Sequence, residues 1–373
     1  MIAGAALLAW AWLLALHGRF WQSGPVLASV RPHEAPVVVP AVVIVVPARD
    51  EAEVIARSLG SLLAQDYSGP YRIILVNDNS RDATAAIARE LPGSGRLTVI
   101  QGRARPAGWA GKLWAVHQGV AASTESLVLL TDADIEHDPG HLSSLVAQAE
   151  ATGCDMVSEM VRLNTTSWAE RALVPAFVYF FQLLYPFAWV NDPLRATAAA
   201  AGGSVLIRRA ALARIGGVAS IADRLIDDCA LAEKVKRGGR IWLGHSDLAR
   251  SIRRYPGLID IWRMVSRSAY VQLRHSPLLL AGTVLSLGLV FLAPPGFALW
   301  GEGNARAAGL LGWAAMAASL LPTLRRYGRS GAWAPFLPLI AIFYMAATLG
   351  AAWSHHFGHG VAWKGRAYAA GRA

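Results

Sequence analysis

The chain of 373 residues has little cysteine, little charge and no basic tract of the kind that binds nucleic acid. Its only cysteines, Cys154 and Cys229, share no metal-ligand spacing, and two isolated thiols fit a reducing compartment. The formal net charge is +10, but no dense run of lysine and arginine is interleaved with aromatic residues, so nucleic-acid binding is not predicted. The sequence also has no internal repeat and no low-complexity segment.

Charged residues make up 16% of the chain, a low fraction for a soluble protein, and they are scarcest at the C-terminal end. Residues 277–373 contain a single acid, Glu302, and apolar runs at about 278–300, 307–322 and 334–353 that are predicted to span a membrane. Three arginines lie between the last two runs, which places that loop in the cytoplasm. Counting back along the chain, the mixed-charge middle is then predicted to be cytoplasmic as well.

The N-terminal end supplies a fourth candidate span. Residues 2–16 are apolar, and the predicted span, residues 1–21, is just long enough to cross a bilayer. No basic region precedes this run and no small-residue cleavage site follows it, so a transmembrane helix is favoured over a cleaved signal peptide. Residues 22–40 contain four prolines and are predicted to be an irregular linker. Four spans put the C-terminal tail outside the cytoplasm, in conflict with its three basic residues, Lys364, Arg366 and Arg372.

Two further segments are predicted to lie on the membrane surface. Residues 168–190 are rich in aromatic side chains and are interrupted by prolines, which favours helices lying in the surface, although a core helix of the globular domain is an alternative. Residues 250–276 carry six arginines and one acid among apolar residues. This composition is typical of a basic amphipathic helix that faces anionic headgroups.

The middle of the chain, residues 41–249, is predicted to be one catalytic domain of the α/β class. Strand-like runs alternate with helical patterns, which indicates a mostly parallel sheet covered by helices on both faces. The strands are expected at 42–46, 72–77, 97–100, 126–131 and 155–159, and the helices at about 51–65, 82–90, 111–121 and 140–151.

Asp132 and Asp134 form an Asp-Ala-Asp motif where the apolar run 126–131 leaves the predicted sheet. Two carboxylates at such a point can meet one divalent cation, or reach the sugar or phosphate of a bound nucleotide. The alternative is two solvated loop acids, because short acidic motifs recur by accident.

Other polar residues fall at similar places. The first strand runs into Pro47, Ala48, Arg49 and Glu51, and the second into Asp78, at the carboxyl ends where open α/β sheets bind ligands. Lys112 stands at a helix start, where its charge and free backbone N–H groups would suit a diphosphate.

Two motifs follow later in the chain. Gly202 and Gly203 precede another apolar strand, as either a tight turn or a place where a ligand approaches the backbone closely. Asp227 and Asp228 open a helix; they either stabilise its dipole or include a general base.

Taken in order, these motifs resemble an inverting family 2 glycosyltransferase of the GT-A fold over roughly residues 41–275. Asp50 stands where that family usually has Asn, and Asp227 stands where it usually has Glu. One leading span and several trailing spans resemble the hopanoid-biosynthesis-associated branch and, more distantly, the ceramide glucosyltransferases. Of the Gln-x-x-Arg-Trp motif of membrane relatives, residues 264–268 keep only Arg267.

The resemblance implies a role for each candidate residue. Asp228 would be the catalytic base, and Asp134 would ligate Mg²⁺ or Mn²⁺. The nucleotide-sugar, with a UDP-sugar favoured, would meet Pro47, Ala48, Arg49, Glu51, Asp78, Lys112 and Asp132. The acceptor side would comprise Gly202, Gly203, Asp227 and Arg267.

The function implied is transfer of a sugar from a nucleotide-sugar to a membrane lipid, with a hopanoid favoured, by a multi-pass protein of the bacterial inner membrane whose catalytic domain is cytoplasmic. A polyprenyl-phosphate glycosyltransferase and a glycan synthase of the same fold are alternatives. A nucleotidyltransferase fits the Gly-Gly and Asp228 segments less well. A lipid transporter or flippase with a decayed catalytic domain is disfavoured, because the candidate spans carry almost no charge.

Overall fold

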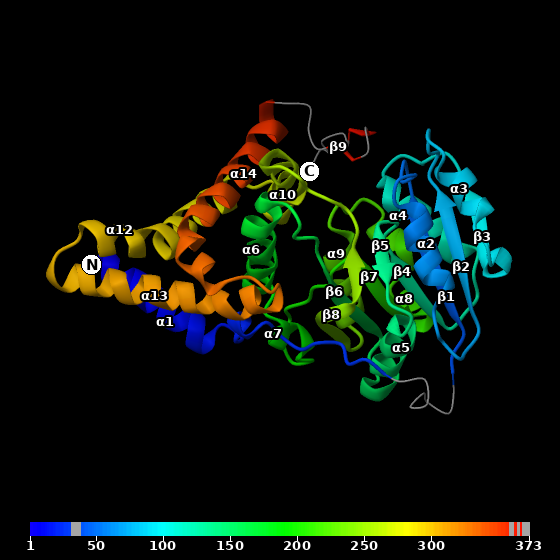
Figure 1. The fold of residues 1–373 in the computed structure, drawn as a ribbon, viewed down its shortest axis with the longest axis horizontal. Coiled ribbons are helices and arrows are strands. Elements are labelled where there is room, and N and C mark those ends of the chain that lie inside the picture. The colour runs from blue at the N-terminus through cyan, green and yellow to red at the C-terminus, as the bar shows by residue number, and fades with distance from the viewer. Residues whose placement is uncertain (31–38, 358–361, 364–365, 368–373) are drawn as a thin grey trace. The chain divides into compact units, whose positions relative to one another are not determined.

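The computed structural model describes residues 1–30, 39–357, 362–363 and 366–367. The chain divides into two compact units. An α/β unit consists of Pro25–Asn164 and Trp189–Arg253, and a helical unit consists of Met1–Gly24, Thr165–Ala188 and Arg254–Ala373. Figure 1 labels elements of both units.

The α/β unit is built on one sheet with the strand order β3-β2-β1-β4-β7-β6-β8-β5. Its parallel pairs are β1 with β2 and β4, β2 with β3, and β6 with β8, whereas β7 runs antiparallel to β4 and β6, and β5 to β8. The strands are β1 Val42–Ala48, β2 Tyr71–Asn77, β3 Leu97–Gln101, β4 Leu127–Thr131, β5 Ile135–His137, β6 Met156–Arg162, β7 Ser204–Arg208 and β8 Ile241–Ser251.

Helices cover this sheet and close its core. They are α2 Ile55–Leu63, α3 Thr84–Glu90, α4 Gly111–Ala121, α5 His141–Thr152, α8 Arg209–Arg214 and α9 Asp227–Lys236, with short 3₁₀ turns at Ser94–Arg96 and Val218–Ile221. Helix α4 packs on β1 and β2 at close range, because a Cβ on Gly119 would lie 2.5 Å from Cγ1 of Val45. Val42 to Val46 are fully buried, as expected of a central strand covered on both faces.

The five strands and four helices predicted for residues 41–160 are all present, with ends shifted by a few residues. Strands β5 and β8 were not predicted. Because β8 continues to Ser251, the basic helix predicted from residue 250 begins only at Leu258, as α10. Arg250 and Arg253 therefore belong to the α/β unit, in which Arg250 pairs with Glu136.

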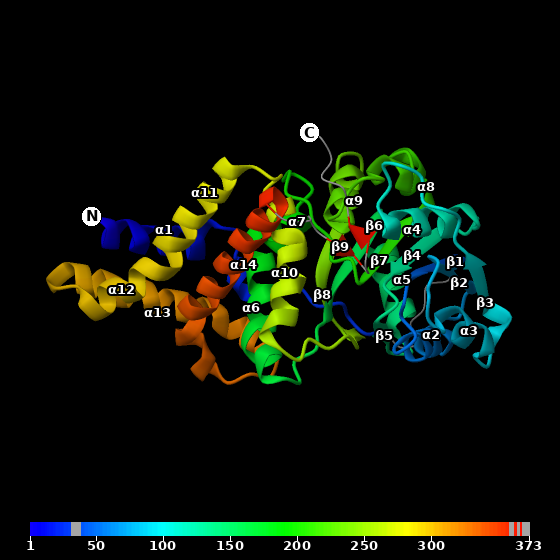
Figure 2. The ribbon, with the colours of Figure 1, turned by 90° about the horizontal axis from the view of Figure 1, so that it is seen from above.

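The helical unit contains apolar helices from both ends of the chain (Figure 2). These are α1 Ile2–Leu16, α6 Trp168–Leu184, α10 Leu258–Gln272, α11 Pro277–Leu287, α12 Ala293–Trp300, α13 Gly303–Arg326 and α14 Leu337–Phe357. Shorter elements are Phe20–Gln22, the π-helical Gly288–Leu292, Gly331–Phe336, β9 Ala362–Trp363 and β10 Arg366–Ala367, and α7 Phe187–Asn191 crosses the boundary between the units. Gly309 of α13 lets the antiparallel α12 approach closely, because a Cβ there would lie 2.5 Å from the backbone nitrogen of Ala298.

Three helical stretches in the described residues are long and apolar enough to cross a membrane. They are Pro277–Trp300, Gly303–Arg326 and Gly331–Phe357, and they contain the three C-terminal spans predicted from sequence. The N-terminal helix α1 is shorter than the predicted span of residues 1–21, with 15 residues. At 1.5 Å per residue it reaches about 22 Å, less than the hydrocarbon core of about 30 Å.

Helix α6 belongs to the helical unit and not to the α/β unit, and its predicted place on a membrane surface stays a prediction. It packs inside the helical unit, where Tyr179 is fully buried and its hydroxyl lies 2.8 Å from Oγ of Ser319. The hydroxyl of Tyr344 donates to the carbonyl oxygen of Leu173 over 2.9 Å. The aromatic composition thus reflects packing against other apolar helices. Part of the predicted linker, residues 31–38, and the tail bases Lys364 and Arg372 lie outside the described residues.

Candidate active site

The strand order brings the predicted motifs to one edge of the sheet. The parallel strands β2, β1 and β4 are neighbours and end at Asn77, Ala48 and Thr131. The antiparallel strand β7 begins at the same edge, because Thr131 is paired with Ser204. Segments that are far apart in sequence, from residues 47–51 to 202–203, therefore meet at this edge.

The turn after β1 is fastened to the turn after β2. The backbone N–H of Asp78 donates to the carbonyl oxygen of Ala48 over 2.8 Å, and Nη1 of Arg49 donates to the carbonyl oxygen of Asp78 over 2.8 Å. Asp50 has a left-handed backbone, with φ of 51°, and its carboxylate accepts from the backbone N–H of Arg81 over 2.7 Å. Aspartate tolerates this conformation better than most residues, so the turn holds its shape without glycine.

Arg253 connects the metal candidate Asp134 to the nucleotide candidate Glu51. Its Nε lies 2.5 Å from Oδ2 of Asp134, and its Nη2 lies 2.8 and 3.0 Å from the two carboxylate oxygens of Glu51. Sequence reasoning missed this residue, because it assigned Arg253 to a helix on the membrane surface. The available signal was the apolar run 241–243, which begins β8.

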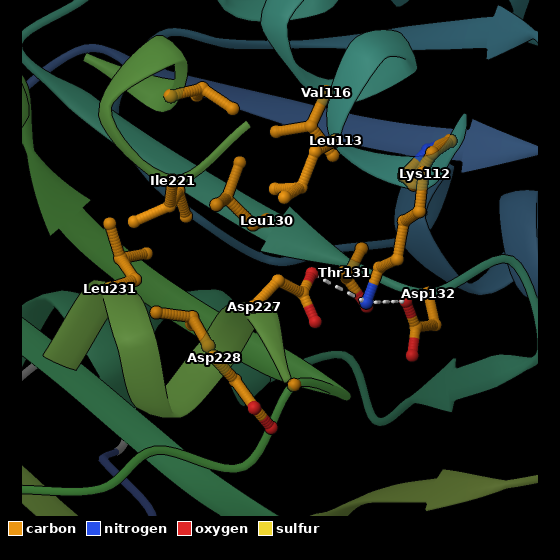
Figure 3. Close-up of a pocket in the computed structure, with 14 residues that line it drawn as sticks. Lys112, Leu113, Val116, Leu130, Thr131, Asp132, Ile221, Asp227, Asp228 and Leu231 are labelled. Carbon is orange, nitrogen blue, oxygen red and sulfur yellow. Dashed lines mark ion pairs between the residues drawn. The ribbon is translucent and has the colours of Figure 1, made fainter. Parts of the chain in front are cut away.

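Lys112, the second residue of α4, lies between two carboxylates. Its Nζ is 2.9 Å from Oδ1 of Asp132 and 3.2 Å from Oδ2 of Asp227 (Figure 3). Burial lowers the pKa of Lys112, but the two carboxylates outweigh burial and raise the pKa above its usual range. The two carboxylates therefore favour the charged form of the lysine.

Asp228 is turned away from Lys112 in Figure 3. Burial and the neighbouring charge of Asp227 raise the pKa of Asp228 to about 6, against an opposing effect of Lys112. The backbone N–H groups of Cys229, at 2.8 Å, and of Gly202 donate to its carboxylate. A Cβ on Gly202 would lie 3.1 Å from Oδ2 of Asp228, so this close approach favours glycine.

A pocket lies beside these groups, and Figure 3 shows the side chains around it. Its charged wall consists of Lys112, Asp132, Asp227 and Asp228. The remaining wall is mostly aliphatic and is formed by Pro47, Leu113, Val116, Leu130, Thr131, Gly202, Val205, Val218, Ile221 and Leu231. Such a combination of apolar walls and a few converging charges is typical of a ligand site.

The oxygen atoms at this edge of the sheet decide whether the predicted Mg²⁺ or Mn²⁺ could bind here. Within the part of the chain that the structure describes, no three His, Cys, Asp or Glu side chains are grouped to hold a metal ion. The carboxylates of Asp132 and Asp134 remain as donors. This set fits Mg²⁺ or Mn²⁺, because such ions are commonly held by one or two carboxylates together with substrate phosphates and water.

The candidate residues thus fall into two groups. All except Arg267 belong to the α/β unit, at or next to the edge formed by β2, β1, β4 and β7. Arg267 is an exposed residue of α10 in the helical unit, so its acceptor-side role stays a prediction.

Known proteins match part of this chain. The profile of the family Glycosyl transferase family 2 matches residues 43–216. An uncharacterized glycosyltransferase of Mycobacterium tuberculosis is 37% identical over 118 residues, which are 32% of this chain and 47% of the relative. A 4,4'-diaponeurosporenoate glycosyltransferase of Staphylococcus aureus is 34% identical over 95 residues, 26% of this chain and 24% of the relative. The chain therefore spans about half the length, or less, of these curated relatives.

Among solved structures, a mannosyltransferase from Pyrobaculum calidifontis in complex with GDP-Man and Mn²⁺ superimposes with a TM-score of 0.56. The alignment has 20% sequence identity and covers 94% of this chain and 99% of that chain, so it shows the fold alone. The predicted fold class, a GT-A-like and mostly parallel sheet, is confirmed. Residues 43–216 of this chain match the family Glycosyl transferase family 2, and the chain has a GT-A-like fold.

Proposed function

We propose that the protein is an inverting glycosyltransferase that moves one sugar from a nucleotide-sugar to a hydroxyl group of a membrane lipid. The observation that carries this proposal is the geometry at Asp228. A carboxylate with a pKa raised to about 6 lies at a pocket beside the Asp-Ala-Asp motif. A base with a pKa near the operating pH suits removal of a proton from an attacking hydroxyl.

The arginine-rich turns support the donor part of the proposal. Arg49 and Arg253 line the β1 edge together with Glu51, Asp78 and Asp134, and these groups suit the hydroxyls, base edge and diphosphate of a nucleotide-sugar. The mannosyltransferase of similar fold was solved with GDP-Man. For this chain a UDP-sugar is the favoured donor, on the family resemblance.

Asp134, with Asp132 beside it, would hold Mg²⁺ or Mn²⁺, and a bound divalent cation would supply charge neutralisation for the leaving diphosphate. The chain's own residues account for the remaining steps. Lys112 adds a fixed positive charge next to Asp132, where negative charge collects as the nucleotide leaves. The aliphatic side of the pocket limits water, which would otherwise compete as acceptor.

Asp228 would act on the acceptor. Its carboxylate accepts the proton of the acceptor hydroxyl as the hydroxyl oxygen bonds to the anomeric carbon. The bond from that carbon to the diphosphate oxygen breaks on the opposite face, so the configuration inverts. The backbone N–H groups of Gly202 and Cys229 hold the carboxylate in place for this proton transfer.

A lipid acceptor is supported by the three apolar helical stretches that are long enough to cross a membrane. A lipid hydroxyl leaves the bilayer only at high cost, so an enzyme that uses one benefits from a membrane anchor. The predicted topology, with a cytoplasmic catalytic domain on the bacterial inner membrane, follows from the arginines between the last two stretches. A hopanoid is the favoured acceptor on family resemblance, and one partial relative is a 4,4'-diaponeurosporenoate glycosyltransferase.

The test uses membranes that contain the full chain, a panel of nucleotide-sugars with Mn²⁺, and mass spectrometry of the extracted lipids. We expect one lipid class to gain the mass of one sugar with one donor. Membranes with the Asp134→Ala variant serve as the matched control and should give no such product. A wild-type protein that binds nucleotide and Mn²⁺ yet modifies no lipid with any donor would contradict the lipid acceptor.

A further inference from the structure

A chain of buried polar side chains runs under the glycine loop of the site. Thr131, His137, His141 and Glu159 are each at most 3% exposed, and all lie in the α/β unit. They come from β4, β5, α5 and β6, whose other buried side chains are mainly aliphatic. The proposed chemistry assigns them no task.

The link to the site is the hydroxyl of Thr131. Its Oγ1 donates to the carbonyl oxygen of Gly203 over 2.8 Å. Nε2 of His137 lies 3.1 Å from the same Oγ1. Because the hydroxyl proton is engaged with Gly203, this histidine nitrogen must carry a proton and act as the donor.

The hydrogen bond between the two histidines fixes which ring nitrogen donates and which accepts. Nδ1 of His137 lies 3.2 Å from Nδ1 of His141. Burial, with a smaller effect of His141, lowers the pKa of His137 well below its usual range, so His137 is neutral and its Nδ1 accepts. His141 therefore donates from Nδ1, while its Nε2 shares a hydrogen bond with Oε1 of Glu159 and lies 3.4 Å from Oγ of Ser204. The three bonds from His141 through His137 and Thr131 to Gly203 then all point the same way.

The loop of Gly202 and Gly203 depends on hydrogen bonds from other segments to fix its backbone. Gly202 and Gly203 are adjacent, and glycine has more backbone freedom than any other residue. Ser158 holds the preceding residue, since its Oγ accepts from the backbone N–H of Ala201 over 2.8 Å and lies 3.1 Å from its carbonyl oxygen. On the other side of Gly202, the hydroxyl of Thr131 holds the carbonyl oxygen of Gly203. Between these two anchors, the N–H of Gly202 is directed at Asp228.

These four hydrogen-bonded side chains are poorly suited to stabilising the fold. Oε2 of Glu159 is buried and has no hydrogen-bond partner among the described residues. Leaving such an atom unsatisfied costs on the order of 1–3 kcal/mol. Well-packed aliphatic residues at these positions would avoid that cost.

We propose that Thr131, His137, His141 and Glu159 are positioning residues of the transfer reaction, which hold the Gly202 and Gly203 backbone where the N–H of Gly202 bonds the carboxylate of Asp228. The inference rests on the proposed function, because it assigns these hydrogen-bonded side chains a role in positioning the proposed base. Of the four, Thr131 lines the pocket, whereas the proposed roles at the reacting atoms belong to Asp228, Asp134 and Lys112. The effect of the four positioning residues is expected in turnover and in the ionisation of Asp228, and not in binding of the nucleotide.

The test compares Thr131→Val with Thr131→Ser in the full chain. Valine keeps the shape but removes the hydroxyl, whereas serine keeps the hydroxyl. We expect Thr131→Val to lower kcat by about 10- to 100-fold, as loss of a positioning contact does. Thr131→Ser should retain most of the wild-type kcat. The KM for the nucleotide-sugar should change less than about twofold in both variants.

A second readout separates positioning from a general loss of structure. If the N–H of Gly202 leaves Asp228, the pKa of that carboxylate rises, and the acidic limb of kcat/KM moves to higher pH in Thr131→Val. Ser144→Ala is the matched control, since Ser144 is a buried hydroxyl of α5 whose bonds go to Gly140 and Val30. This variant should lower the melting temperature without changing kcat or shifting the acidic limb of the pH dependence of kcat/KM.

The outcomes are distinct. An active wild type together with a folded Thr131→Val that keeps wild-type kcat and pH profile overturns the positioning role alone. A wild type that binds nucleotide and Mn²⁺ but transfers no sugar overturns the proposed function and this inference together. Should Thr131→Val not fold, His137→Leu and His137→Gln repeat the comparison one link further from the loop, with glutamine keeping a donor and an acceptor.

Discussion

The two halves of the candidate site hold their acidic side chains in different ways. In the arginine half, Arg49 lies near Asp50 and Asp78, and Arg253 pairs with both Glu51 and Asp134. In the lysine half, Lys112 makes ion pairs with Asp132 and Asp227, and Asp228 follows Asp227 directly in sequence. Acids outnumber bases by two in both halves. Planar arginines fix the position of the acids they bind, whereas the lysine is a flexible point charge, and burial adds to the effect of the neighbouring acid on Asp228.

That difference assigns a task to each half. Fixed, charge-paired groups are suited to binding a donor of constant charge, because their own ionisation does not change on binding. A carboxylate in an acid-rich, buried place holds a proton more readily and can exchange it near neutral pH. The arginine half should therefore control binding, and the lysine half should control proton transfer.

The largest effect is expected for Asp228→Asn. Asparagine keeps the shape but cannot accept the acceptor's proton, so kcat should fall by about 10²- to 10⁴-fold in a lipid-glycosylation assay. Binding of nucleotide with Mn²⁺, measured by calorimetry, should stay within about twofold of wild type. Asp223→Asn is the matched control, because Asp223 is a nearby acid with a 77% exposed side chain. Turnover retained in purified Asp228→Asn would refute the base assignment.

A smaller effect, on the other half, is expected for Arg253→Ala. Without the guanidinium, Glu51 and Asp134 lose their shared partner and repel both each other and the donor diphosphate. The KM for the nucleotide-sugar should rise about tenfold, with a smaller change in kcat. Arg250→Ala serves as control, since Glu136, its partner, keeps Arg57. A variant whose main loss is in kcat, with donor KM unchanged, would remove the distinction between the halves.

The sequence predicted the motifs at the strand ends well, for a local reason. Apolar runs 42–46 and 126–131 mark buried strands, and in a parallel sheet their carboxyl ends must share one edge. Arg253 was missed because it pairs with a residue 202 positions away, and no local pattern reports such a contact. The buried histidines were missed for the same reason. Aromatic composition could not place α6, because lipid and apolar helices select the same side chains.

The central claim, that Asp228 ionises under the opposing influences of Asp227 and Lys112, is tested most directly by the pH dependence of kcat/KM for the lipid acceptor. The raised pKa means that the active carboxylate form is lost as the pH falls through about 6, so activity should decline there. Lys112→Gln removes a charge that lowers this pKa and should move the acidic limb to higher pH, whereas Asp227→Asn removes one that raises it and should move the limb to lower pH. Limbs that stay in place, or move in the same direction in both variants, would contradict the account.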